Sequence, residues 1–264
     1  MSIAVVGSLA IDRIAGGPPR VGGCPFYAAR ALRALGTSAV IVAKCAARDR
    51  ETLLPPLVRL GLPVLWRDSA ASAAFSIDYD GGDHRRMSIE AIADPWRPDE
   101  VALPHVRWAH VAPLAGSDFP AETLAALSRG RTISYDAQGL VRPDRVGPLH
   151  ASAEYDPELL RFVSILKIAE DEAELLVDGF DEKALRRLGV PEVVVTLGSR
   201  GCIVFVDGMA ELVRAHRVES PDPTGAGDAF AAAYLAARAH GAAPTAAARR
   251  ACALVADILA GRAR

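Results

Sequence analysis

The sequence contains no asparagine, one glutamine and only three lysines among its 264 residues. Lysine and arginine together number 30, so 27 of these residues are arginine. A mechanism that needs an asparagine side chain is therefore excluded. None of the lysines lies in a G-x-x-x-x-G-K-[ST] loop, with which phosphate-loop enzymes hold a nucleotide. The sequence does not support a Walker-type ATPase.

Other absences narrow the function further. The net charge is −2, and the basic residues are scattered, so nothing favours nucleic acid as a partner. The four cysteines form no C-x-x-C pair and no zinc pattern, which is typical of reduced, buried thiols. No signal peptide and no run of about 18 apolar residues is present. We expect a soluble cytoplasmic protein with no membrane partner.

Strand-length apolar runs alternate with helical patterns along most of the chain. The runs lie at 3–7, 38–43, 62–66, 107–112, 132–136, 163–168 and 192–198. The helical patterns between them include 25–36, 121–130 and 170–180. This order predicts an α/β fold with a mostly parallel sheet covered by helices on both faces. With no linker or repeat evident, we expect one domain over 1–264.

Two regions depart from this alternation. Residues 73–79 and 84–89 alternate apolar and polar side chains around a DGGD turn, which predicts a hairpin with one exposed face that could act as a flap. Residues 202–207 and 210–215 flank Gly208 and predict antiparallel strands at the end of the sheet. Two helices are expected to follow, over 227–241 and 244–264.

The segment 219–237 carries the strongest chemical signal. Gly225, Ala226 and Gly227 stand where an alanine-rich helix is expected to begin, so backbone N–H groups and the positive helix end can approach an anion such as phosphate. Asp228 follows in the first turn. A carboxylate beside a phosphate site fits a base that accepts a proton from an attacking hydroxyl, as in a small-molecule kinase. The alternative is a helix start whose acidic residue complements the dipole.

The motif DPTGAGDAF at 222–230 resembles the D-[TP]-T-G-A-G-D-[AS]-F signature of the ribokinase-like (PfkB) carbohydrate kinase family. Segments 22–36, 73–89 and 193–205 resemble, in family order, the glycine-pair helix, the lid and the nucleotide-side strands. The resemblance implies a ribokinase-like three-layer sandwich with a small β lid formed mainly by 73–90. It also implies an ATP-dependent phosphotransferase acting on a hydroxyl of a sugar, polyol or nucleoside.

The resemblance assigns roles on the acceptor side. Asp228 would be the catalytic base, and the amides of Gly225, Ala226 and Gly227 an anion hole, which acts through positioned dipoles and needs no lysine. Asp12 would hold acceptor hydroxyls. The remaining residues on this side are Gly22, Gly23, Tyr27, Gln138 and Arg142.

On the donor side, the family pattern places Thr196, Gly198, Gly201 and Thr224 along ATP. The segment 166–176 resembles K-x-N-x-x-E, which makes Glu172 the residue that orders Mg²⁺ through water. Alternatively, 196–201 is only a hairpin turn and Glu172 a solvated helix start. The resemblance also allows a monovalent cation such as K⁺ and a homodimer formed through the lid.

Departures from the family pattern fall at the expected site. Tyr27, Gln138 and Ala169 stand where the family has asparagine, so the acceptor can differ from that of the best-known relatives. The segment from Asp12 to Gly22 is short, so it has little room for a second lid hairpin. Arg85 and Arg86 on the flap would either meet an anionic acceptor or be solvated.

Two other classes of protein compete with the kinase. One is a catalytically inactive ligand-binding or regulatory protein on a kinase fold, which the changes at Tyr27 and Ala169 keep open. The other is a dinucleotide-binding oxidoreductase. Its G-x-G-x-x-G fingerprint is represented at the N-terminus only by Gly7, so this class ranks last.

Overall fold

The computed structural model describes residues 3–79, 85–103, 106–177, 181–216, 218 and 223–263. Its main feature is a nine-stranded sheet with the order β14-β13-β12-β11-β9-β8-β1-β4-β5. The strands are β1 (Ile3–Ser8), β4 (Ala39–Ala46), β5 (Val64–Ser69), β8 (Trp108–Val111), β9 (Thr132–Asp136), β11 (Ile165–Ala169), β12 (Glu192–Thr196), β13 (Cys202–Val206) and β14 (Met209–Val213). Strand β13 pairs antiparallel with both β12 and β14, and the other pairs of this sheet are parallel.

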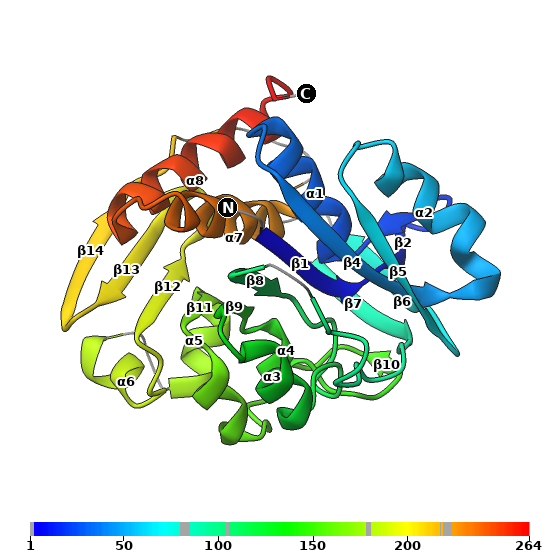
Figure 1. Ribbon diagram of the computed structural model, residues 1–264, viewed down its shortest axis with the longest axis horizontal. Helices are drawn as coiled ribbons and strands as arrows, with labels where there is room; N and C mark the ends of the chain where they lie inside the picture. The colour runs from blue at the N-terminus through cyan, green and yellow to red at the C-terminus, as the bar shows by residue number, and fades with distance from the viewer. Residues whose placement is uncertain are drawn as a thin grey trace.

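Helices cover both faces of this sheet (Figure 1). One face carries α1 (Cys24–Ala34), α2 (Arg50–Val58), α7 (Ala226–Ala239) and α8 (Pro244–Leu259). The other carries α3 (Ala121–Ser128), α4 (Gln138–Val141), α5 (Glu170–Val177) and α6 (Glu182–Arg186). Short 3-10 turns are η1 (Ala47–Asp49), η2 (Pro157–Phe162) and η3 (Gly198–Arg200). The predicted α/β fold with two helical layers is confirmed.

The sequence explains the close packing of the central layer. Every residue of β1 is buried, as expected for a strand with parallel neighbours and helices on both sides. Helix α7 is rich in alanine and largely buried, and its small side chains let it lie directly against α1 and α8.

All four cysteines are buried free thiols. Among the described residues, no helix combines the length and apolar character that crossing a membrane requires.

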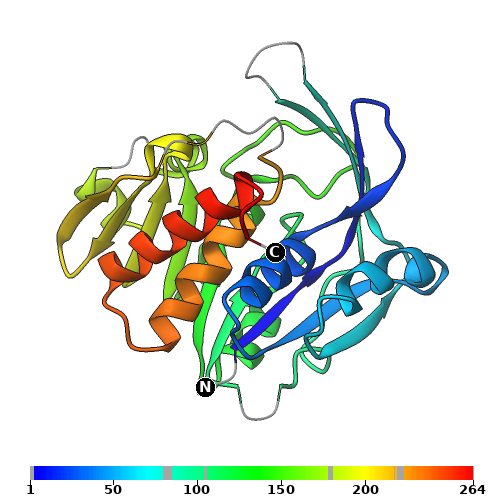
Figure 2. The same cartoon turned by 90° about the horizontal axis from the view of Figure 1, so that it is seen from above.

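A second sheet forms the lid, with the order β10-β7-β6-β2-β3. Its strands are β2 (Ala10–Ile14), β3 (Arg20–Gly22), β6 (Ala73–Tyr79), β7 (Arg85–Ala91) and β10 (Gly147–Pro148). In Figure 2 the β2–β3 hairpin and the β6–β7 pair rise together beyond the main sheet. The flap turn predicted at the DGGD sequence lies outside the described residues.

The expectation that 12–22 has little room for a lid hairpin is wrong. Strands β2 and β3 pair antiparallel, with Asp12 opposite Arg20. The chain reverses within a few residues because Ala15 and Gly16 adopt left-handed conformations, with φ of 48° and 66°. Short as it is, this hairpin extends the lid sheet by two strands.

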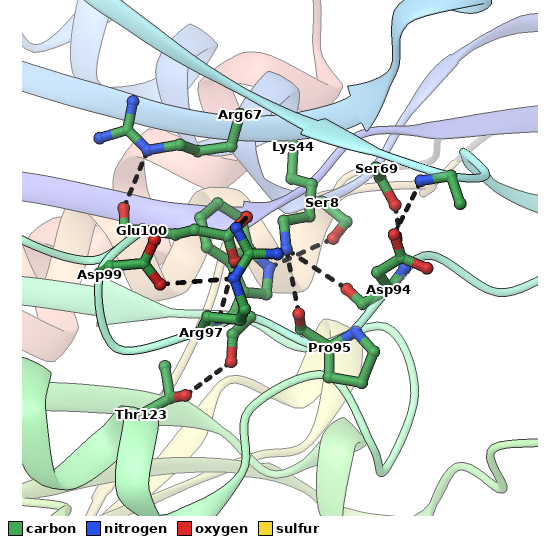
Figure 3. Close-up of polar contacts among 12 residues, drawn as sticks. Ser8, Lys44, Arg67, Ser69, Asp94, Pro95, Arg97, Asp99, Glu100 and Thr123 are labelled. Atoms are coloured by element: carbon green, nitrogen blue, oxygen red, sulfur yellow. Dashed lines mark hydrogen bonds and ion pairs between the residues drawn. The ribbon is translucent and has the colours of Figure 1, made fainter.

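A buried polar network ties the lid to the main sheet (Figure 3). The Lys44 ammonium, at the end of β4, donates to Glu100 Oε2 at 2.7 Å and to the Pro95 carbonyl at 3.1 Å. The Asp94 carboxylate accepts from the Ala70 N–H at 2.8 Å, and its own N–H donates to Ser69 Oγ at 2.9 Å. These bonds hold the segment before β6 and the segment after β7 together and against the end of β4.

Candidate active site

A cavity of about 290 Å³ lies between the lid and the carboxyl ends of the parallel strands; we call it the charged cavity. In open α/β sheets this end of the strands is where ligands bind. The cavity brings together ten predicted site residues: Asp12, Gly23, Tyr27, Gln138, Arg142, Glu172, Thr224, Gly225, Gly227 and Asp228. The lid contributes apolar side chains to its wall: Phe75, Ile77 and Met87.

Helix α7 begins where the sequence analysis expects, with Gly225 as its N-cap. Gly225 caps the helix in a left-handed conformation with φ of 81°, and a side chain there would overlap the ring of Tyr27. The first amides of a helix have no partner within it and can therefore receive an anion. The Ala226 amide, however, donates to the Pro223 carbonyl at 3.0 Å. An incoming phosphate must compete with this carbonyl for that amide.

Asp228 faces the charged cavity from the first turn of α7. Desolvation within the surrounding protein, together with the neighbouring Asp136, raises the pKa of its carboxyl group to about 6. Lys167, the Cys24 thiol and Arg142 oppose this rise. The carboxyl group is therefore deprotonated at neutral pH, yet its pKa lies close enough to that range for it to accept a proton efficiently.

Lys167 and Asp136 are two functional candidates that the sequence analysis missed. The Lys167 ammonium lies 3.3 Å from the Asp136 carboxylate, and both groups are buried in the charged cavity. Burial alone would lower the pKa of Lys167, but Asp136, Glu172 and Asp228 together raise it, so the group is a cation. A Cβ added at Gly227 would lie 3.3 Å from Lys167 Nζ, which places this cation beside the predicted anion hole.

One signal could have revealed both residues. Each is a charged residue in or directly after an apolar run that reads as a buried parallel strand. Charged groups are rarely buried without a partner, so Lys167 in ILKIA and Asp136 at the end of TISYD imply each other. From the sequence we expect a phosphate site that needs no lysine side chain, but Lys167 lines the charged cavity.

Asp12 and the glycine pair form one unit. Asp12 is buried on β2, and its carboxylate lies over the backbone of Gly22, where any Cβ would overlap it. Gly23 caps α1 with φ of 87°, against the Ser8 carbonyl. Gly23 lines the charged cavity, whereas Gly22 makes room for Asp12.

Three more predicted acceptor residues surround the same space. The Tyr27 ring packs on Gly225 and meets Phe26 edge-on, with 5.4 Å between ring centroids. The Gln138 N–H donates to Asp136 Oδ1 at 3.1 Å. The Arg142 guanidinium lies 5.9 Å from the Phe75 ring centroid, so it contacts the lid. Arg86 is exposed and is not among the residues that line the cavity, and the side chain of Arg85 lies outside the described part.

A second cavity, of about 250 Å³, lies on the other side of the α7 entrance; we call it the apolar cavity. The predicted donor residues Thr196, Gly198 and Gly201 line it, whereas Thr224 lines the charged cavity. Its other walls include Val218, Phe230, Cys252, Val255, Ala256 and Leu259. Gly227 and Pro223 line both cavities. The two spaces therefore meet at the predicted anion hole.

Glu172, the predicted magnesium residue, lines the charged cavity. Its Oε2 accepts the Ala169 N–H at 2.7 Å, and burial raises the pKa of its carboxyl group. In the part of the chain that the structure describes, no three His, Cys, Asp or Glu side chains form a group that could hold a metal. A Mg²⁺ ion commonly takes one or two carboxylates and fills its shell with water and phosphate oxygens. The residues present fit that mode of binding.

The fold brings two cavities together at the entrance of α7, with the Asp228 carboxylate beside their junction. A family model described as pfkB family carbohydrate kinase matches residues 115–259. The chain belongs to this family, and is thus a small-molecule kinase.

Known relatives agree with this placement. Probable fructokinase-3 of Arabidopsis thaliana is 28% identical over 240 residues, which cover 81% of this chain and 68% of that protein. Inositol 3-kinase of Zea mays is 35% identical over 159 residues, which cover 58% of this chain but only 40% of that protein. A solved pyrophosphate-dependent kinase in the ribokinase family, complexed with a pyrophosphate analog and myo-inositol, superposes with a TM-score of 0.86 at 24% identity, covering 98% of this chain and 95% of that one. The ribokinase-like fold is therefore confirmed.

Proposed function

We propose that this protein transfers the γ-phosphoryl group of ATP to a hydroxyl of a cyclic polyol or sugar. The observation that carries the proposal is the meeting of the charged and apolar cavities at Gly227, with Asp228 and Lys167 beside the junction. An acceptor in the charged cavity and a nucleotide in the apolar cavity would bring the acceptor hydroxyl and the γ-phosphate together beside Gly227.

The acceptor class follows from the size and lining of the charged cavity. About 290 Å³ suits a single small ring, and Asp12, Gln138 and Arg142 offer acceptors and donors for several hydroxyl groups. Tyr27 and Phe75 supply flat apolar surface for a ring face. The relatives include a probable fructokinase and an inositol 3-kinase, whose names also favour a sugar or a cyclic polyol.

The chemical step uses groups at the α7 entrance. Asp228 accepts the proton of the acceptor hydroxyl, whose oxygen forms a new bond to the γ-phosphorus. The bond from that phosphorus to the β,γ-bridging oxygen breaks, and ADP leaves with the electron pair. The amides of Gly225 and Gly227 and the Lys167 ammonium stabilise the negative charge on the transferring group, because fixed donors cost no reorganisation during the reaction.

On the donor side, the apolar cavity would hold the adenine ring between Phe230 and the α8 side chains. Mg²⁺ would be held near Glu172 through water and would neutralise phosphate charge when bound. A monovalent cation such as K⁺, a lid-mediated homodimer, a cytoplasmic location and the absence of a nucleic-acid partner stay predictions.

Pyrophosphate is a second candidate donor. A solved structure with a similar fold is described as a pyrophosphate-dependent kinase. Pyrophosphate would need only the anion hole and Lys167, and would leave the apolar cavity unused. The existence of that cavity favours ATP.

The deciding experiment is a donor-by-acceptor panel. Purified protein with Mg²⁺ is given ATP or pyrophosphate and a set of hexoses, ribose, inositols and nucleosides, and the products are identified by ³¹P NMR. We expect a phosphorylated polyol or sugar with ATP. Faster transfer from pyrophosphate would overturn the donor assignment, and binding without turnover would favour the regulatory protein. A nucleoside turned over fastest would overturn the acceptor class.

A further inference from the structure

The loop that follows β8 is closed by a buried carboxylate; we call residues 112–118 the β8 loop. Asp118 is only 2% exposed, and its Oδ2 accepts the Leu114 N–H at 2.7 Å. Its own N–H donates to the Ala115 carbonyl at 3.2 Å, so two hydrogen bonds close the loop on itself. Leu114 lines the charged cavity, and the loop is therefore part of the wall of that cavity.

The β8 loop also supports α4, through two close contacts. The Gly116 N–H donates to the Arg142 carbonyl at 3.0 Å, at the end of the helix. Within the helix, Gly139 lies so close to Pro113 that a Cβ added there would overlap the proline ring. Gln138 begins α4, Arg142 is its C-cap, and both line the charged cavity. The positions of these two side chains therefore depend on the loop.

Packing alone does not explain why the buried residue that closes this loop is a carboxylate. Burial raises the pKa of the Asp118 carboxyl group to about 6, although the backbone N–H groups bonded to it and the charges of Lys44 and Arg142 oppose the rise. Lys44 is already paired with Glu100 at 2.7 Å. A buried carboxylate costs free energy that its hydrogen bonds must offset, and the bond that Asp118 accepts holds the β8 loop. The contribution of Asp118 is therefore the shape of this loop.

We infer that Asp118 is a positioning residue, which closes the β8 loop so that Gly116 fixes the end of α4 and Arg142 is held in the charged cavity. The Arg142 guanidinium lies 5.9 Å from the ring centroid of Phe75, so the same side chain also contacts the lid. A group that binds substrate works only when its own position is fixed by the residues behind it. This inference rests on the proposed function, because it assumes that the acceptor occupies the charged cavity and is bound by Arg142.

The kinetic test is a double-mutant cycle between Asp118 and Arg142. It uses ATP, Mg²⁺ and the acceptor of highest turnover in the panel of hexoses, ribose, inositols and nucleosides. For Asp118→Ala we expect KM for the acceptor to rise about tenfold, the size of one hydrogen bond to a charged group, while KM for ATP stays unchanged. In a chain that already carries Arg142→Ala, the same substitution should cause no further rise, because the two residues act through one link. Additive losses, or equal rises in KM for both substrates, would overturn the inference.

Three further variants separate this role from a general loss of stability. Gly116→Ala leaves Asp118 in place but puts a Cβ 3.1 Å from the Arg142 carbonyl oxygen, so it should also raise KM for the acceptor. Asp118→Asn keeps an oxygen for the same hydrogen bond and should restore the KM of the parent protein. Asp181→Ala is the matched control, because Asp181 accepts a backbone N–H at 2.7 Å at the start of α6 and does not line the charged cavity. It should leave KM for the acceptor unchanged.

The outcomes distinguish a failure of this inference from a failure of the proposed function. If Arg142→Ala leaves kcat and KM for the acceptor unchanged, the acceptor does not use Arg142 and the proposed acceptor site fails. If Arg142→Ala raises that KM while neither Asp118→Ala nor Gly116→Ala does so, only the role of Asp118 fails. If Asp118→Ala does not fold, an unchanged KM in Gly116→Ala still overturns the inference.

Discussion

The two cavities that meet at Gly227 are built from opposite kinds of residue. The charged cavity encloses Asp12, Asp136, Lys167 and Asp228, whereas the apolar cavity has no acidic residue, lysine or arginine in its described lining and is walled mostly by glycine and apolar residues. Titratable groups with perturbed pKa values concentrate in the first. In the proposed function the charged cavity performs the chemistry and the apolar cavity holds the donor, so substitutions should separate into effects on kcat and effects on donor KM.

Asp228→Asn should give the largest effect. The amide keeps the shape of the side chain but cannot accept the proton, so we expect kcat to fall by about 10²- to 10⁴-fold. The Kd for ATP, measured by titration calorimetry, should stay near that of the parent protein. Near-normal turnover would show that Asp228 does not take part in the chemical step. It would also contradict the assignment of the chemistry to the charged cavity.

Lys167→Met should come next. Removing the cation beside Gly227 takes away charge stabilisation and leaves Asp136 without its ion-pair partner. We expect kcat to fall by about 10²-fold, the usual cost of one preorganised donor, together with a lower melting temperature. Lys183→Met, an exposed lysine on α6, is the matched control and should change neither quantity. Equal losses in both variants would contradict a role at the site.

These candidates show how far sequence reasoning reaches. Asp228 is recognisable because its motif is contiguous, as are β6 and β9, whose observed bounds equal those predicted. The ion pair between Asp136 and Lys167 joins segments that are far apart in the chain, and its only trace in the sequence is a charged residue in each of two apolar runs. Helix α2 was missed for a local reason, since Pro55 and Pro56 lie inside it and prolines argue against a helix.

A substitution that fills the apolar cavity should weaken the binding of the donor without changing the chemical step. Ala256→Phe places a ring in the space proposed for adenine, so we expect KM for ATP to rise about tenfold, equivalent to about 1.4 kcal/mol, with little change in kcat. Ala253→Phe, on the exposed side of α8, serves as the control. If KM for ATP is unaffected by Ala256→Phe, the nucleotide does not use this cavity.

Lowering the pH should change kcat less than any of these substitutions changes its own kinetic constant. Burial raises the pKa of Asp228 to about 6, so lowering the pH protonates the base and removes activity, while raising it above neutrality leaves the base unchanged. At pH 5.5 we expect kcat to be about fourfold below its plateau. Initial rates at saturating substrates across pH 5 to 8 test this, and a plateau that extends unchanged to pH 5 would contradict the raised pKa.

The central claim is that acceptor and nucleotide occupy different cavities and meet at Asp228. A crystal structure with a non-hydrolysable ATP analogue and the preferred acceptor tests it most directly. The account predicts the adenine ring beside Phe230 and Leu259, the γ-phosphate at the amide of Gly227, and an acceptor hydroxyl about 2.6–3.2 Å from the Asp228 carboxylate. A nucleotide base outside the apolar cavity, or an acceptor whose hydroxyl groups lie away from Asp228, would contradict it.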